Sequence, residues 1–125
     1  MKLIKPLLLS LLLCSSGARA EWLYYGETDN STFYIDLATI RKEGNLRRVW
    51  EVLDLKQRRK DGELSYRVRN EYDCKQERYR ILSITSHSGQ MAKGEILESS
   101  SSPAPWRDIP PDTTAKDSLK LVCTN

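Results

Sequence analysis

Short runs of apolar and polar residues separated by turn-forming residues occupy the chain after position 20. The most regular alternation covers residues 64–74, which predicts a strand with one buried and one solvated face. Residues 46–55 are apolar at odd and even positions alike, and such a run predicts a central strand buried on both faces. Further strands are predicted at residues 22–25, 32–37, 79–86 and 90–98.

Turn and helix signals complete this pattern. Asp61-Gly62 favours a tight hairpin turn between the two longest strands, and the Ser- and Pro-rich residues 99–105 predict an irregular connector. After Pro110 and Pro111, apolar residues recur at helical spacing up to Val122, which predicts a C-terminal helix. We therefore expect an α+β fold, a small antiparallel β-sheet with a C-terminal α-helix.

The first 20 residues carry the pattern of a cleavable export signal. A short cationic start precedes a Leu-rich core, and Ala18-Arg19-Ala20 supplies the small residues that signal peptidase requires. We expect a signal peptide at residues 1–20 and one domain at 21–125, exported to the periplasm, the cell surface or the medium. Leu13 before Cys14 does not fit lipoprotein processing, and we expect no transmembrane segment in the mature chain.

Charge is unevenly distributed in the mature chain. Without Lys2, Lys5 and Arg19, 17 basic residues balance 17 acidic ones, but residues 41–80 hold 13 basic and eight acidic residues. Part of this excess forms a cluster that we call the basic loop: Lys56, Arg58, Arg59 and Lys60. The cluster is a candidate contact for heparin-like polyanions or acidic segments of matrix proteins, and the alternative is a solvated hairpin tip. Export disfavours nucleic acid as a partner.

Two cysteines remain once the signal peptide is removed. In an oxidising compartment Cys74 and Cys123 have one possible pairing, and their bond would tie the helix to the strand that ends at Cys74. Closing this loop stabilises the fold by roughly 4 kcal/mol on the chain-entropy model. Two distant cysteines and the single His87 do not make a zinc site, so we expect neither metal nor cofactor.

Catalytic signatures are weak. Glu71 and Asp73 share one strand face in the manner of glycosidase carboxylates, but Arg67 and Arg69 share it too, so we expect an exposed row of ion pairs. We interpret His87 as a solvent-exposed loop residue. The chain is therefore expected not to be an enzyme. The aromatic residues near the mature N-terminus predict either core packing or a binding or dimer patch: Trp22, Tyr24, Tyr25, Phe33 and Tyr34.

A series of short motifs resembles the surface-adhesin protein E family over nearly the whole mature chain. In order they are Phe33-Tyr34-Ile35-Asp36, Thr39-Ile40-Arg41, Val49-Trp50, Glu71-Tyr72-Asp73-Cys74, Arg80-Ile81-Leu82, Met91-Ala92-Lys93-Gly94, Trp106-Arg107-Asp108-Ile109-Pro110 and Leu121-Val122-Cys123. The resemblance implies a bacterial envelope protein with a small antiparallel sheet, a C-terminal helix joined to it by the disulfide, and a tendency to form homodimers.

The same resemblance implies a function in binding. The family's namesake is an adhesin for host matrix and serum proteins of the laminin, vitronectin and plasminogen class. We therefore expect an exported protein that recognises host proteins of this kind. The alternative is a periplasmic structural or stress-related accessory protein with no host ligand.

Overall fold

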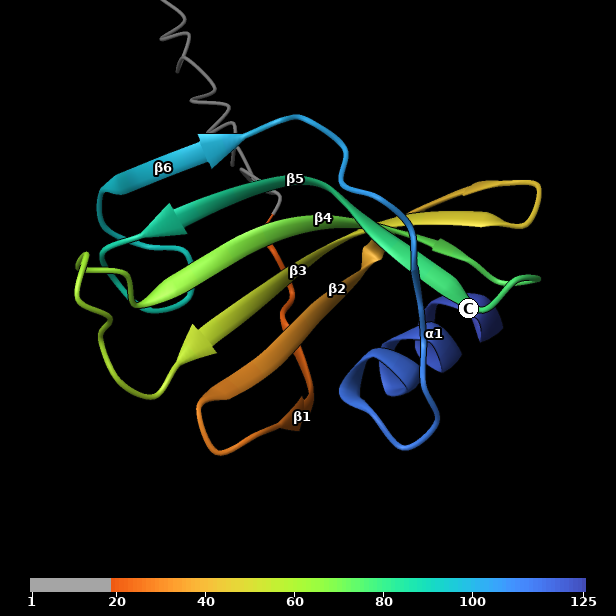
Figure 1. Ribbon diagram of the computed structural model, residues 1–125, viewed down its shortest axis with the longest axis horizontal. Coiled ribbons are helices and arrows are strands. Elements are labelled where there is room, and N and C mark those ends of the chain that lie inside the picture. Colours follow the sequence, from red (N-terminus) through yellow and green to blue (C-terminus); the bar gives the residue numbers. More distant parts are fainter. Residues whose placement is uncertain (1–18) are drawn as a thin grey trace, which may run out of the picture.

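The computed structural model describes residues 19–125, so the first 18 positions of the expected signal peptide lie outside the described residues. The described chain forms seven strands followed by one helix (Figure 1). The elements are β1 (Leu23–Glu27), β2 (Ser31–Glu43), β3 (Leu46–Leu55), β4 (Ser65–Asp73), β5 (Arg78–His87), β6 (Ile96–Ser100), β7 (Arg107–Asp108) and α1 (Thr114–Thr124).

The strands form one antiparallel sheet in which neighbours in sequence are neighbours in space. The order is β1-β2-β3-β4-β5-β6, and the two-residue β7 pairs with β5. Figure 1 shows a twisted sheet with α1 packed below one of its ends. The expected α+β fold is confirmed, and its hairpin connections follow from the short turns between strands.

The disulfide and the helix close one end of the sheet. Cys74 and Cys123 are bonded, with their Cα atoms 5.9 Å apart, as predicted. Thr113 caps α1, because its side chain accepts a hydrogen bond from the Lys116 backbone amide at 3.2 Å. The apolar face of α1 packs on the sheet to form the core, which consists of Ile35, Val49, Tyr72, Ile109, Leu119 and Val122.

The segment before β6 differs from its prediction. Residues 90–95 are not a strand, because Lys93 N donates to Gln90 O and Gly89 N donates to Lys93 O in a compact turn. Met91 and Ala92 have φ of +55° and +59°, a left-handed conformation that no strand adopts. The Met91 amide donates to the Asp54 carboxylate at 2.7 Å, which holds the turn against β3. β6 begins only at Ile96 and includes Ser99 and Ser100, which the sequence had placed in a connector.

The helix covers only part of the sheet face on which it packs. An α-helix of 11 residues is about 16 Å long, whereas the 10 residues of β3 extend about 33 Å. Residues nearer the β3–β4 loop therefore have no helix over them. In Figure 1 this part of the sheet lies to the left of α1.

Candidate functional site

A large concave site lies on the part of the sheet that α1 leaves uncovered, and we call it the groove. Its cavity volume is about 630 Å³, within the range of small-molecule sites. The sheet contributes most of its lining, the first turns of α1 form one end, and Arg59 and Arg107 are the two cations that line it. The sheet residues are Tyr25, Phe33, Glu51, Leu53, Tyr66, Val68, Asn70, Tyr72, Tyr79, Ile81 and Ile84.

A buried carboxyl group lies in the floor of the groove at its helix end. Glu51 is 1% exposed, and three groups donate to its carboxylate: the Tyr25 hydroxyl at 2.6 Å, Asn70 Nδ2 at 2.5 Å and the Tyr72 hydroxyl at 2.5 Å. The Tyr72 hydroxyl also lies 2.8 Å from Ser118 Oγ on α1. This network joins four elements of the fold through one side chain.

Burial dominates the electrostatics of this network. Desolvation raises the pKa of Glu51, and the hydrogen bonds from Tyr25, Tyr72 and Asn70 lower it by less. The pKa of Tyr72 is raised by burial and then by the neighbouring Glu51 carboxylate. Sequence reasoning missed Glu51. The available signal was an acid at the centre of the apolar residues 49–53, within a strand that was itself predicted to be buried on both faces.

The basic loop is held in a defined conformation at the opposite end of the groove. Lys56 Nζ lies 2.7 Å from Glu27 Oε2, and Arg58 donates to the carbonyl oxygens of Gly62 and Ser88 at 2.8 and 2.6 Å. Gly62 N donates to Arg59 O, and the φ of Gly62 is +92°, so a turn does end at Gly62. The predicted tight hairpin is wrong, because the nine residues 56–64 form a longer loop between β3 and β4. Two of the four cations are therefore engaged within the protein.

The other two cations of the basic loop point to separate surroundings. The Arg59 guanidinium lies 5.8 Å from the centre of the Tyr66 ring and lines the groove. Lys60 is exposed at the tip of the loop. The structure thus brings Arg59 to the groove and leaves Lys60 facing solvent, while Lys56 and Arg58 fasten the loop to β1 and to the turn before β6.

The predicted exposed ion-pair row on β4 is wrong for Glu71. Glu71 is 1% exposed and lies between Arg48 on β3 and Arg80 on β5, with both contacts at 2.8 Å. Arg48 and Arg80 are its direct neighbours in the sheet register, whereas the arginines considered from sequence lie along β4 itself. Alternation along one strand could not identify partners on adjacent strands.

The second carboxylate of the suspected catalytic pair also has a structural role. Asp73 accepts hydrogen bonds from the backbone amides of Lys75 and Gln76 and lies 3.3 Å from Arg78 Nε. The Gln76 amide and the Arg78 side chain lower the pKa of Asp73 despite partial desolvation. Both carboxylates are thus committed to the fold.

Trp106 stacks on two arginines on this face of the sheet. Its ring lies 4.6 Å from the guanidinium carbons of both Arg78 and Arg80. Cation–π contacts of this kind fix the segment before β7 against the sheet. The same face carries Arg67 stacked on Trp50 at 4.3 Å.

His87 is not the exposed loop residue that the sequence suggested. It ends β5, is 5% exposed, and its Nε2 lies 2.7 Å from Thr85 Oγ1. Burial, with a smaller contribution from Arg67, lowers the pKa of the imidazole. A buried imidazole of this kind is not available as a solvent-accessible base.

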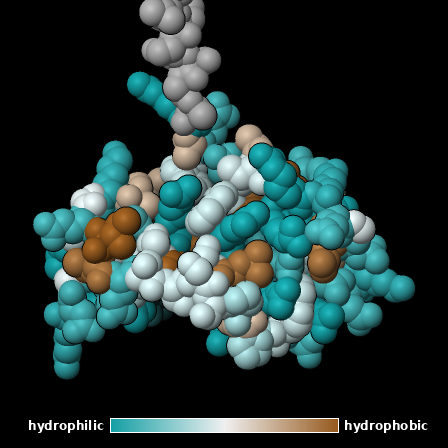
Figure 2. Space-filling model, turned by 90° about the horizontal axis from the view of Figure 1, so that it is seen from above, coloured by the Kyte–Doolittle hydropathy of each residue, from teal (hydrophilic) through white to brown (hydrophobic). Residues whose placement is uncertain are grey.

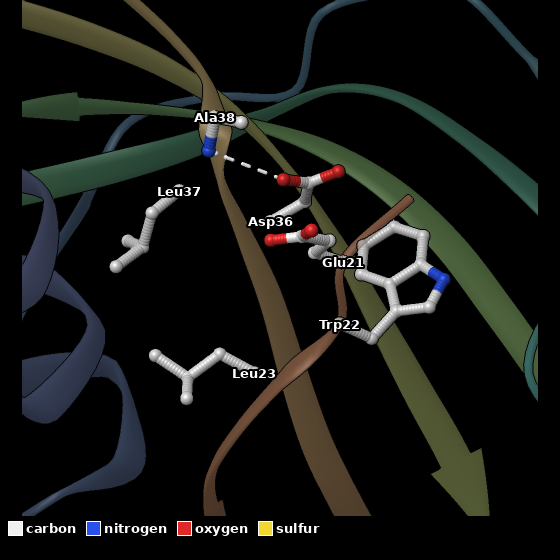
Figure 3. A pocket seen from close by; sticks show the side chains of 6 residues that line it. All are labelled: Glu21, Trp22, Leu23, Asp36, Leu37 and Ala38. Atoms are coloured by element: carbon white, nitrogen blue, oxygen red, sulfur yellow. Dashed lines mark hydrogen bonds between the residues drawn. The ribbon is translucent and has the colours of Figure 1, made fainter. Parts of the chain in front are cut away.

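The N-terminal aromatic residues divide between the two faces of the sheet. Tyr25 packs against Phe33 at a ring-centre distance of 5.9 Å and lines the groove, whereas Tyr24 contacts Tyr34 at 6.1 Å and is 51% exposed. Trp22 lines a smaller pocket of about 330 Å³ with Glu21, Leu23, Asp36, Leu37 and Ala38 (Figure 3). There the Asp36 carboxylate accepts from the Ala38 amide at 3.1 Å and shapes the irregularity in β2.

The remaining surface is mainly polar. Figure 2 shows a largely hydrophilic face with small, separate hydrophobic areas. The exposed large apolar residues belong to the two edge strands and are Leu23, Tyr24, Ile96 and Leu97. Among residues 19–125, no helix has the length and hydrophobicity of a membrane span, and no cluster of three or more metal-ligating side chains occurs.

Comparisons with known proteins agree with this geometry. The family model of the surface-adhesin protein E matches residues 22–124. Crystal form II of Haemophilus influenzae protein E superposes with a TM-score of 0.68 at 16% identity, covering 85% of this chain and 89% of that one. Protein E from non-typeable Haemophilus influenzae gives a TM-score of 0.59 at 16% identity, covering 82% and 76%. At this identity the superpositions establish the fold alone. No curated protein matches by sequence.

Proposed function

Because the chain belongs to the surface-adhesin protein E family, we propose that it is an exported bacterial envelope protein that acts by binding host matrix or serum proteins. The family match over residues 22–124 carries this proposal. It leaves the expected signal peptide at residues 1–20 outside the matched region. The proposed mature domain, 21–125, is non-enzymatic, and its partners are of the laminin, vitronectin and plasminogen class.

The basic loop is the proposed contact with these partners or with heparin-like polyanions. Its support is that four cations lie within five residues and that internal contacts hold the loop in one conformation. A preorganised loop loses less conformational entropy on binding than a flexible one. Arg58, Arg59 and Lys60 have no carboxylate partner among the described residues. Arg58 is held by two backbone carbonyl oxygens, so Arg59 and Lys60 are the cations that a polyanion would meet.

Location is the first test. Protease added to intact cells should remove the protein, and the intact mass of the exported form should correspond to a chain that begins at Glu21 without a lipid. Resistance to protease in intact cells, with digestion after the envelope is opened, would instead favour the periplasmic accessory protein. A lipidated species that begins at Cys14 would overturn the expected processing.

Binding is the second test, and the structure identifies a suitable variant. Arg59→Glu combined with Lys60→Glu reverses two charges without removing the Lys56 and Arg58 contacts that hold the loop. We expect at least about a fivefold loss of affinity for heparin or immobilised laminin, with wild-type binding weakening as salt is added.

A matched control reverses two exposed cations at the other end of β2. Arg41→Glu with Lys42→Glu makes the same change in net charge away from the basic loop. If both double variants bind equally well, or if binding is insensitive to salt, the basic loop is a solvated turn and adhesion uses another surface.

A further inference from the structure

The uncovered floor of the groove is an apolar surface built from several strands. Two rows of residues, aligned by the sheet register, cross it: Phe33, Leu53 and Tyr66 in one, and Glu51, Val68 and Ile84 in the next. Ile81 extends the apolar part towards α1. Five of these seven side chains are fully hydrocarbon, and all of them except the buried Val68 are half-buried, so a ligand that filled the groove would remove their remaining apolar surface from water.

Among the described residues that line the groove, Glu51 carries the only carboxyl group, and its hydrogen bonds are already made within the protein. Glu51 is 1% exposed, and its two oxygen atoms accept hydrogen bonds from Tyr25, Asn70 and Tyr72. A cationic ligand in the cavity would therefore lack an accessible carboxylate among the described lining residues. The charged groups at the two ends of the groove therefore determine which ligand it can bind.

Those groups are two arginines without acidic partners. Neither Arg59 nor Arg107 forms an ion pair within the described part of the chain, although both line the cavity. Arg59 lies over the Tyr66 ring, and Arg107 is opposite Tyr79 in the sheet register. Tyr79 is in turn paired with Tyr72 on β4. On that strand Tyr72 lies six residues from Tyr66, or about 20 Å, and this is the approximate separation of the two arginines. The cations thus lie at opposite ends of an apolar floor.

We propose that the groove binds a single-chain anionic amphiphile, with its acyl chain on Phe33, Leu53 and Ile84 and its carboxylate or phosphate head group at Arg59. The guanidinium donors of Arg59 match the geometry of either head group. Its stacking on Tyr66 restricts the side chain before the ligand arrives. The site shares Arg59 with the proposed host-protein contact, but its acyl-chain contacts lie on the sheet, and Lys60 belongs to the host-protein contact alone.

The preference of the groove for an anionic head group can be measured with probes that have alkyl chains of the same length and differ in the charge of the head group. Calorimetric titration of the mature protein would compare decanoate, decyl phosphate and decyltrimethylammonium below their micelle concentrations. We expect an anionic probe to bind at least about tenfold more tightly than the cationic one, the effect of one charge-assisted contact. Whether decanoate or decyl phosphate binds more tightly identifies the head group. Equal affinity for all three probes, or no binding of either anion, would overturn the proposal.

Variants locate the head group. Arg59→Gln should weaken the anionic probe about tenfold, whereas Lys60→Gln, the neighbouring cation outside the lining, should leave affinity unchanged. An equal effect of the two substitutions would show that only the net charge of the loop matters, and would refute the proposed contact. Heparin binding measured on the same variants separates this site from the proposed adhesin function, because Lys60 contributes to the latter alone.

The position of the ligand's acyl chain can be tested on the wild-type protein, without a substitution in the core. Backbone amide chemical shifts of the wild-type protein should change on titration at Phe33, Leu53 and Ile84, and not at Gly44 in the β2–β3 turn. Ile84→Trp should fill the cavity and abolish binding if its circular dichroism remains native. Shift changes confined to the edge strands, or wild-type affinity in a folded Ile84→Trp protein, would place the ligand elsewhere.

Discussion

The hydroxyl group of Tyr72 on β4 lies 2.8 Å from Ser118 Oγ on α1, across the interface between the sheet and the helix. The same hydroxyl lies 2.5 Å from Glu51 Oε2. Polar contacts between buried groups are costly to leave incomplete, so this pair couples the position of α1 to the buried carboxyl group. Polar and covalent contacts thus attach the helix at three places: the disulfide near its C-terminus, Ser118 in its middle, and the ion pair between Lys116 and Glu77 in the β4–β5 turn.

Tyr72→Phe removes this link while keeping the ring. We expect the free energy of unfolding to fall by about 1–3 kcal/mol, because Glu51 loses a donor in a buried site. Tyr79→Phe is the matched control, since Tyr79 stacks on Tyr72 but its hydroxyl has no side-chain partner recorded among the described residues. Urea titration measures both variants. Equal destabilisation would contradict the role of the Tyr72 hydroxyl.

The raised pKa of Glu51 predicts a pH dependence of stability. A carboxyl group whose pKa is higher in the folded than in the unfolded state binds a proton on folding. Its contribution is therefore complete below the ordinary carboxyl pKa and is lost as pH rises through the folded value. Between pH 5 and pH 8 the free energy of unfolding of wild type should decline relative to that of Glu51→Gln.

The comparison with Glu51→Gln is needed because the titration of His87 also changes the free energy of unfolding in this pH range, and in the opposite direction to that of Glu51. The lowered pKa of His87 gives a contribution that is present above the ordinary histidine pKa and is lost as pH falls. When the free energy of unfolding of Glu51→Gln at each pH, measured by urea titration, is subtracted from that of wild type, the His87 contribution cancels. Parallel profiles for wild type and Glu51→Gln would show that the carboxyl group does not titrate in this range.

Glu71 should be far more important for stability than its exposed neighbour Glu43. Glu71→Gln removes the buried anion between Arg48 and Arg80, whose side chains are 34% and 31% exposed, and the loss of charge-assisted hydrogen bonds should cost about 1.5–3 kcal/mol. Glu43 also contacts Arg48, at 2.9 Å, but its side chain is 71% exposed, so Glu43→Gln should cost less than about 1 kcal/mol. Thermal unfolding of the two variants checks the ranking. A similar loss in both would refute it.

Reduction of the Cys74–Cys123 bond should lower the melting temperature by more than about 10 °C, because loss of roughly 4 kcal/mol is large for a domain of this size. Scanning calorimetry with and without reductant measures the shift. Thiol counting on the unreduced, denatured mature protein should find no free thiol. A reduced protein that melts within a few degrees of the oxidised one would show that packing alone holds α1.

Local sequence patterns were sufficient to predict the strands at residues 46–55, 64–74 and 79–86 and the helix that contains Leu119 and Val122. Alternation and helical spacing reflect the geometry of one element, so they can be read without knowing its neighbours. The cysteine pair was equally accessible, because only one pairing was possible in the mature chain.

Burial of the charged residues was decided only by tertiary structure. Alternation assigned Glu71 to the face away from the helix, but Arg48 and Arg80 from the neighbouring strands flank it there, and it is 1% exposed. Trp106, about 35 positions later in the sequence, stacks on Arg80. The acid in the apolar run, Glu51, became the centre of a network because the register placed donors around it. The groove exists because α1 is shorter than the strands beneath it, a mismatch between two elements that neither element's own sequence records.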